Sequence, residues 1–468
     1  MKNRKVTNSI KKVIKRASAI ICLAVWCTIC FGESSVTAAE AKGPISTILA
    51  AKYYTNAQGF QRVSFYLLCD TNDNLYISGD LRTKRFLCNF PNAMKYKFGI
   101  RQNGDVIAVF RSEFSKAEAS YGPELDNVRK NPRVLLRSER YRKVHEVDFG
   151  EYNKETGEGL KPCGWLENCG FCSLPDGDVL FVEYTRMGVV YTANCWRIKA
   201  DSNLTDPNNW EIIKQFQVAE SDKITTYDES VIEHFHTVQR DPYTGIIYLA
   251  TGDLRKKSQM WYSRDKGDNW EQQIFTDPST GKTLTSGEKY FRILNYNFTD
   301  EYVYWSSDSS KKHAILRCER AESGELDPDS ITVLAELEPL DGSPATYGTV
   351  FDSKNNFMVL MERCDAKAES MRFRVYDLED DTVKTIDMIN AAGGEGSQIG
   401  FRTEYTEFEP VDGVIKIGFG PNSGYRNHND LCGNPGDSDW RNNINNMWIK
   451  VNRGSDGEIV AEYGYYQI

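Results

Sequence analysis

Two histidines at alternate positions, His234 and His236, are the residues of this sequence best suited to do chemistry. The chain of 468 residues holds only five histidines, so a closely spaced pair stands out. Alternate side chains of a strand point to one face, so we expect the two imidazoles to lie side by side. Such a pair can supply a base and its orienting partner, bind a metal, or join neighbouring segments through hydrogen bonds. Spacing identifies no third metal ligand, so we assign no metal ligands and leave a His-bound divalent metal open.

Carboxylates, arginines and tyrosines recur where strand-like segments begin or end. As a site, the arginines could bind a carboxylate or sulfate on a sugar, and the tyrosine rings could stack on sugars. As structure, the charged residues would form solvated ion pairs at loop ends, but their concentration favours a site. We predict catalytic roles for His234, His236, Asp253, Glu183 and Tyr347, and substrate-binding roles for Arg186, Arg255, Arg292, Arg402, Tyr184, Tyr425 and Arg426. Equivalent positions hold Arg111, Glu113, Asp308, Glu362, Arg363 and Glu404.

Residues 234–276 predict the structural unit that positions the histidines. Strand-like runs at 234–240, 246–253, 260–263 and 271–275 alternate with turn sequences, which indicates four antiparallel strands. The rest of the chain divides in the same way, into units at 46–90, 96–148, 168–217, 291–335, 345–387 and 401–464. A repeat of about 55 residues in the later half is typical of a radial array of sheets. We therefore predict an all-β propeller of seven four-stranded blades, with six as the alternative count, in one domain of residues 40–468.

Propeller geometry predicts which residues meet. The first strand of each blade begins, and the second ends, on the same face near the axis, whereas the turn after the third strand lies at the opposite, outer edge. His234, His236, Asp253 and Arg255 should therefore converge with their counterparts from other blades. The loop 420–446 should lie on this axial face, where it could act as a lid or bind calcium through its Asp and Asn residues.

The octapeptide Ser263–Trp270 has the pattern S-x-D-x-G-x-x-W and resembles an Asp-box, the turn signature of sialidase-like propellers. The preceding pattern HxHxVxxDPxxGxxYxxTGD is similar to that of uncharacterised secreted BNR-repeat proteins. The resemblance implies a β-propeller in which Asp265 and Gly267 shape a turn and Trp270 packs between sheets. Sialidase chemistry is not implied, because the segment 291–294 lacks the proline of the sialidase motif and lies in the fifth unit.

Residues 1–39 predict a cleaved secretory signal. Basic residues crowd positions 2–16, residues 17–31 are apolar, and small residues at 36–39 suit cleavage. The apolar run is shorter than the ~20 residues of a spanning helix, which disfavours a retained membrane anchor. The chain has a net charge of −9. Because nucleic-acid binding relies on neutralising phosphates, this charge disfavours a nucleic-acid partner.

Cysteine content gives little further constraint. Nine of the twelve cysteines remain after removal of the signal, so at least one is unpaired or joins another chain. Cys163, Cys169, Cys172 and Cys195 form the one sequence cluster, which favours buried thiols or a local disulfide over zinc.

Together these features predict a secreted, monomeric, carbohydrate-active protein that cleaves an acidic polysaccharide or glycan at the axial face. Some polysaccharide lyases with propellers use His and Tyr as base and acid and Arg to neutralise a uronate, which the predicted residues would suit. A glycoside hydrolase with Glu183 and Asp253 as its two carboxylates fits the predicted residues equally well. The alternative is a non-catalytic propeller that binds a glycan or a protein.

Overall fold

The chain divides into two units, Met1–Gly43 and Pro44–Ile468. The computed structural model describes residues of the second unit only: 47–55, 61–70, 72–111, 129–153, 155–166, 168–185, 190–219, 230–253, 257–309, 313–337, 346–352, 356–362, 370–389, 403–406, 414–419 and 446–465. The predicted signal 1–39 lies outside these residues. Among the residues described, no helix has both the length and the apolar character needed to cross a membrane.

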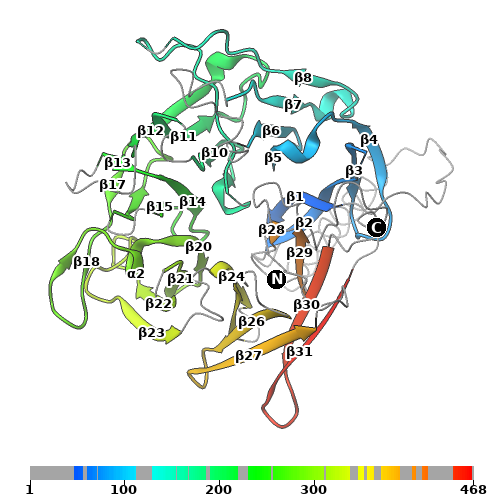
Figure 1. Cartoon of the computed structure of the whole chain (residues 1–468). Coiled ribbons are helices and arrows are strands. Elements are labelled where there is room, and N and C mark those ends of the chain that lie inside the picture. The colour runs from blue at the N-terminus through cyan, green and yellow to red at the C-terminus, as the bar shows by residue number, and fades with distance from the viewer. Residues whose placement is uncertain are drawn as a thin grey trace, which may run out of the picture. The chain divides into compact units, whose positions relative to one another are not determined.

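The first three sheets are antiparallel meanders in which strands pair in sequence order (Figure 1). They comprise β1 (Thr47–Thr55), β2 (Gln61–Cys69), β3 (Asn74–Ser78) and β4 (Arg85–Asn89); β5 (Tyr96–Ile100), β6 (Val106–Phe110), β7 (Arg133–Leu135) and β8 (Val144–Glu146); and β9 (Phe171–Ser173), β10 (Val179–Val182), β11 (Thr192–Ile198) and β12 (Trp210–Val218). The third sheet gains an outer strand, β13 (Val231–Ile232), that runs parallel to β12.

Four more meanders follow. They comprise β14 (His234–Arg240), β15 (Ile247–Gly252), β16 (Met260–Ser263) and β17 (Glu271–Gln272); β20 (Ile293–Phe298), β21 (Tyr302–Ser307), β22 (His313–Glu319) and β23 (Thr332–Leu337); β24 (Thr346–Asp352), β25 (Phe357–Glu362), β26 (Ser370–Asp377) and β27 (Thr382–Ile389); and β28 (Thr403–Thr406), β29 (Val414–Phe419), β30 (Asn446–Arg453) and β31 (Ile459–Tyr465). The described residues thus contain all seven units that the sequence predicts.

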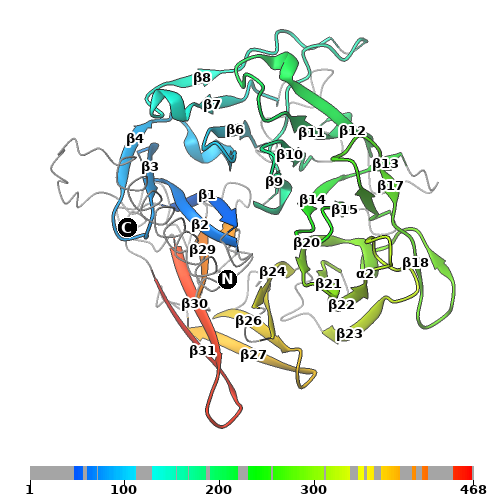
Figure 2. The same ribbon diagram turned by 180° about the vertical axis from the view of Figure 1, so that it is seen from behind.

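Short elements connect these sheets. β18 (Phe275–Thr276) and β19 (Thr283–Leu284) form a separate hairpin. The helix α2 (Glu288–Phe291) lies beside β21 and β22, as Figure 2 shows from behind. The single-turn helices are η1 (Ala93–Lys95), η3 (Arg137–Glu139), η4 (Asn168–Gly170) and η5 (Pro207–Asn209). The predicted fourth strand at 271–275 is thus shorter than expected, because the chain leaves the sheet after Gln272 to form the hairpin.

Contacts between first strands arrange the sheets as a propeller. β1 contacts β5, and β14 contacts both β9 and β20. β24 contacts β20 and β28, and β28 returns to β1. Between β5 and β9, the ring of Phe171 fills the space beside Gly99, where any Cβ would overlap it. Lys416 of β29 also donates a hydrogen bond of 2.8 Å to the hydroxyl of Tyr66 on β2. The ring therefore closes by packing of the last sheet on the first.

The hydrophobic core is divided among the interfaces between sheets. Each strand is too short to bury its apolar face alone, so neighbouring sheets pack face to face. One cluster joins the β14–β17 and β20–β23 sheets around Tyr248 and Trp305, both fully buried. Another joins the β9–β13 and β14–β17 sheets around Phe216 and Phe235. These clusters fix the relative position of the three sheets that carry the site described next.

The cysteines of the described residues are all free thiols, the sequence cluster included: Cys69, Cys88, Cys163, Cys169, Cys172, Cys195 and Cys318. All but Cys172 are buried.

Candidate functional site

His234 and His236 occupy the start of β14 and are both only 1% exposed. His234 pairs with Gly252 on β15, and a register shift between Phe235 and Thr237 makes His236 an extra residue in the strand. Such a bulge bends a strand and redirects a side chain. The Nδ1 atoms face main-chain carbonyls, His234 that of Thr185 at 2.9 Å and His236 that of Ile293 at 3.2 Å. A carbonyl oxygen only accepts hydrogen bonds, so each Nδ1 carries a proton.

Asp253, the residue after β15, contacts both histidines through its carboxylate. Its Oδ2 lies 3.4 Å from Nε2 of His234, and its Oδ1 lies 3.5 Å from Nε2 of His236. The Asp253 backbone has φ of 55°, in the left-handed region that disfavours residues with a Cβ. Directly before it, Gly252 leaves room for the imidazole of His236, since a Cβ there would overlap the ring.

Arg292 brings the next sheet to the same carboxylate. Its Nη2 contacts Oδ1 of Asp253 and lies 2.9 Å from Oδ2 of Asp308, the residue that follows β21. Glu288 of α2 lies 4.0 Å from Nη1 of Arg292. The main chain supports this placement, because Asp308 N donates to the carbonyl of Arg292 at 2.8 Å. Arg292 therefore bridges two carboxylates that end the second strands of adjacent sheets.

Tyr184 brings the preceding sheet to the site. Its ring centroid lies 4.0 Å from that of His234 and 6.4 Å from that of His236, and the two imidazoles are 5.1 Å apart with an interplanar angle of 27°. Burial opposes the charge of Arg292, but the carboxylates of Asp308, Asp253 and Glu288, with Tyr184, raise its pKa. The His–Asp cluster, defined as His234, His236 and Asp253, is thus flanked by an aromatic phenol and a guanidinium.

The electrostatics of the two histidines differ. Burial opposes protonation of His234, but the carboxylates of Asp253 and Glu233 outweigh it and raise its pKa. For His236, burial dominates and lowers the pKa to about 4. Burial alone would raise the pKa of Asp253, but both histidines and Arg292 hold it well below its usual range. The carboxylate of Asp253 is therefore ionised, and its side chain is 29% exposed, which gives the cluster an opening to solvent.

Glu183 lies next to this site in sequence but has a different environment. Its carboxylate pairs with Arg129 at 2.7 and 3.1 Å, and both side chains are almost completely buried. It also accepts hydrogen bonds from Cys163 N at 3.0 Å, from the main-chain and side-chain nitrogens of Asn194 at 3.0 and 2.8 Å, and from Trp196 Nε1 at 2.8 Å. Six donors use the acceptor capacity of both oxygens, so Glu183 joins β11 to Arg129 and Cys163 rather than to the His–Asp cluster.

The remaining predicted residues are not placed in the cluster. Tyr347, Glu362 and Glu404 lie on β24, β25 and β28, with only their main chain described. Arg111 is buried after β6, and its Nε donates to the carbonyl of Tyr96 at 3.4 Å. The other predictions lie outside the described residues: Glu113, Arg186, Arg255, Arg363, Arg402, Tyr425, Arg426 and the rest of the loop 420–446.

Three contributors to the cluster were missed by the sequence reasoning. The carbonyl of Thr185 orients His234, the absence of a side chain at Gly252 admits His236, and Glu288 contacts Arg292. Gly252 could have been noticed from its place before a polar strand end, where a glycine often marks close approach of another group. A carbonyl contact from a residue 49 positions away leaves no such sequence signal.

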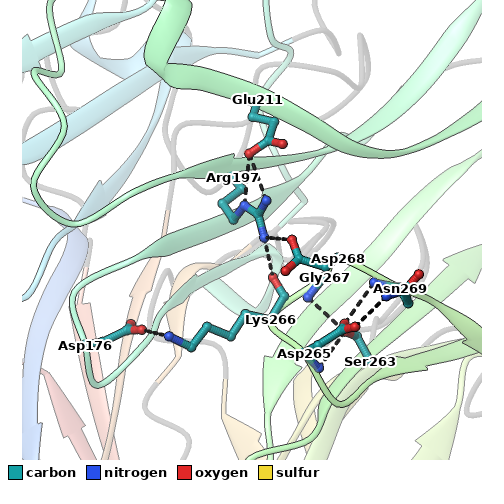
Figure 3. A network of polar contacts seen from close by, with 9 residues as sticks. All are labelled: Asp176, Arg197, Glu211, Ser263, Asp265, Lys266, Gly267, Asp268 and Asn269. Carbon is teal, nitrogen blue, oxygen red and sulfur yellow. Dashed lines mark hydrogen bonds and ion pairs between the residues drawn. The ribbon is translucent and has the colours of Figure 1, made fainter.

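The opposite end of the same sheet carries the turn Ser263–Trp270, whose sequence resembles an Asp-box. Ser263 Oγ accepts from Gly267 N at 2.8 Å, and Asp265 accepts from Asn269 N at 2.8 Å. Figure 3 shows how this turn docks on the preceding sheet: Lys266 contacts Asp176, and Arg197 bridges Asp268 at 2.6 Å and Glu211 at 2.9 Å. Trp270 packs against the cluster between the two sheets. The turn Ser263–Trp270 thus joins adjacent sheets.

Comparison with known proteins adds little beyond the architecture. No protein-family model matches the chain, and no curated protein matches it. Among solved structures it is similar to the Dos1 propeller, with 11% identity over 78% of this chain and 79% of that one and a TM-score of 0.40. It is also similar to YCF48 from Cyanidioschyzon merolae, with 9% identity over 80% and 92% and a TM-score of 0.43. The same identity and TM-score hold for Saccharomyces cerevisiae Sqt1, over 80% and 81% of the two chains. Similarities at this level carry no argument about function, and the propeller assignment rests on the sheets themselves.

Proposed function

We propose that this chain is a secreted, monomeric propeller of the sialidase-like, BNR-repeat type that cleaves an acidic polysaccharide by β-elimination at the His–Asp cluster. The observation that carries the proposal is the convergence of two buried imidazoles on the carboxylate of Asp253. The Asp-box turn, with Gly267 at φ of 94° and Asp265 bonded to Asn269 N, supports the relationship to BNR-repeat proteins.

β-Elimination needs two kinds of group, and the site holds both. A base removes the proton at C5 of a uronate, the electron pair forms the C4–C5 double bond, and the C4–O bond breaks. The departing sugar oxygen then takes a proton, so the products are an unsaturated uronate and a new sugar end. A phenol and imidazoles are suitable proton-transfer groups, and a cationic group can neutralise the uronate carboxylate. The ring of Tyr184 lies 4.0 Å from that of His234, and Arg292 reaches the same site through its ion pair with Asp253.

Hydrolysis is less well supported by the same geometry. A glycosidase of the usual kind needs two carboxyl groups that flank the scissile bond. Glu183 accepts six hydrogen bonds from protein donors, and Asp253 and Asp308 share Arg292. The pKa of Asp253 is held well below its usual range by the histidines and Arg292, which disfavours Asp253 as a general acid.

A panel of acidic polysaccharides, incubated with the purified protein, tests the proposal. The expected result is ultraviolet absorbance from an unsaturated uronate product together with new reducing ends. Tyr184→Phe keeps the aromatic ring on His234 but removes the hydroxyl, so it should slow the reaction by about 10²-fold or more if the phenol transfers a proton. Reducing ends without the new absorbance would indicate a hydrolase and contradict the proposal.

A non-catalytic propeller that binds a glycan or a protein is the second candidate. It is favoured by one observation: Arg292 already pairs with Asp253 and Asp308, which leaves less of its charge for a substrate. Binding of a polysaccharide in the same panel without any product would support this candidate.

A further inference from the structure

The two histidines and Asp253 leave an electrostatic conflict between them. Each Nδ1 faces a carbonyl and therefore carries a proton, so a neutral ring presents a lone pair at Nε2. Both Nε2 atoms point at oxygens of an ionised carboxylate, which also accept. Nε2 of His234 is buried and has no hydrogen-bond partner. A buried acceptor that faces another acceptor is unfavourable unless a proton or a cation lies between them.

Protonation resolves this conflict poorly. Satisfying both contacts with protons would make two imidazolium ions whose ring centroids are 5.1 Å apart, each 1% exposed and beside Arg292. Like charges at this distance in a poorly solvated site repel strongly. A single cation bound by both Nε2 atoms and the carboxylate would interact favourably with the lone pairs of all three groups at once.

We propose that His234 Nε2, His236 Nε2 and the Asp253 carboxylate form a binding site for a divalent transition-metal ion of the zinc class. These ligand atoms all lie within 4.8 Å of one another. Two ligands held ~2.0–2.1 Å from zinc at tetrahedral angles lie ~3.4 Å apart. Nε2 of His234 lies 3.4 Å from Oδ2 of Asp253 and Nε2 of His236 lies 3.5 Å from Oδ1, so each imidazole is close to that separation from one of the two carboxylate oxygens.

The surroundings fit a metal centre as well as the ligands do. Histidine ligands usually donate their second ring nitrogen to a carbonyl or carboxylate, which fixes the ring and directs the other nitrogen at the metal. Thr185 and Ile293 supply these carbonyls. Nitrogen donors favour zinc-class ions over calcium or magnesium, which prefer oxygen.

The ligand count gives the ion an open position. Catalytic zinc sites commonly have three protein ligands and leave the fourth position to water or substrate. The Asp253 side chain is 29% exposed, so the ion would reach solvent on that side. With the ion bound, the two imidazoles no longer transfer protons, which leaves that role to Tyr184. The open position would take the uronate carboxylate of an acidic polysaccharide, a role that rests on the proposed function, whereas metal binding itself does not.

Metal titration of the full chain tests the site without any polysaccharide. The protein is purified without a histidine tag, stripped with chelator, and titrated with Co²⁺ and Zn²⁺. We expect a single ion per chain, a visible Co²⁺ spectrum typical of tetrahedral nitrogen and oxygen ligands, its loss on adding Zn²⁺, and no competition from Ca²⁺. His236→Gln and Asp253→Asn should each weaken binding by more than the ~10–100-fold that loss of an outer-shell partner costs.

The chain supplies a matched control in His313. This histidine is also fully buried and also faces a carbonyl with Nδ1, that of Ser307 at 3.2 Å, but it lies outside the cluster. His313→Gln should bind Co²⁺ as the unsubstituted protein does. Thermal melting of every variant separates loss of the site from loss of the fold, and the unsubstituted protein should melt at a higher temperature with Zn²⁺. Failure of the unsubstituted protein to bind either ion, or equal binding by a folded Asp253→Asn variant, would overturn the proposal.

Discussion

The polar groups at the two ends of the β14–β17 sheet have different kinds of partner. At the Asp-box end, Ser263 and Asp265 bond within the turn, and Arg197 and Lys266 pair with carboxylates across to the next sheet. At the other end, the Nε2 atoms of His234 and His236 face the oxygens of Asp253, and His234 Nε2 has no hydrogen-bond partner. Ion pairs and turn hydrogen bonds stabilise a fold, whereas a buried unsatisfied nitrogen that faces a carboxylate is a place where a ligand can bind. The recognisable motif and the candidate site thus lie on one sheet but differ in kind.

The largest effect on stability should come from substituting Glu183, a carboxylate that is next to the site in sequence but has a structural role. Glu183→Ala leaves Arg129 buried without its partner, which should cost about 3–5 kcal/mol of unfolding free energy. Chemical denaturation measures this loss. A variant as stable as the unsubstituted protein would contradict the structural role of Glu183.

His313 provides a lone buried histidine to compare with the cluster. Burial, with Arg374 and Arg292 adding to it, lowers its pKa to about 4. The unfolded chain therefore takes up a proton between about pH 6.5 and 4 that the folded chain refuses, and folding loses up to a few kcal/mol as the pH falls through that window. His313→Gln should reduce this acid sensitivity in unfolding curves recorded at several pH values. An unchanged pH dependence would contradict the assignment.

Gly252→Ala tests the clearance that admits His236. A Cβ would overlap the imidazole, so the ring must move away from Asp253, at a cost of about 1–3 kcal/mol. Co²⁺ binding should fall much more than stability does. Gly245→Ala offers a comparison at the far end of the same strand pair, where the turn glycine has φ of 82°, and it should lower stability without affecting Co²⁺ binding. Equal losses of Co²⁺ binding in both variants would contradict the specific role of Gly252 in admitting His236.

The smallest effect belongs to the Asp-box. Asp265→Ala removes hydrogen bonds to Asn269 and Ser263 at a partly exposed turn, so it should lower stability by about 1 kcal/mol. Thermal or chemical denaturation measures it. A loss of metal binding in this variant would show that the two ends are coupled.

Much of the architecture could be predicted from the sequence because it depends on local patterns. Short apolar strands separated by turn residues gave the seven units, and glycines such as Gly245 and Gly267 adopt the positive φ that those turns require. The convergence of His234, Asp253 and Arg292 also follows from strand order, since first-strand starts and second-strand ends share one face in a meander.

The finer features of the site depend on contacts that sequence spacing does not encode. Glu183 looked like a catalytic carboxylate until its bonds to Arg129, 54 positions earlier, placed it in a structural network. The bulge at His236 and the left-handed backbone of Asp253 are not marked in the alternation pattern that predicted the strands. For the same reason, Asp253 could not be recognised as a third ligand beside the histidines.

A paired rate measurement tests most directly the claim that the chemistry belongs to the histidine end. Asp253→Asn and Asp265→Asn make the same chemical change at opposite ends of one sheet, and formation of unsaturated uronate is measured per folded molecule on a polysaccharide that the unsubstituted protein cleaves. We predict a loss of about 10²-fold or more for Asp253→Asn and an unchanged rate for Asp265→Asn. Equal rates for the two variants, or no unsaturated product from the unsubstituted protein on any acidic polysaccharide, would contradict the account.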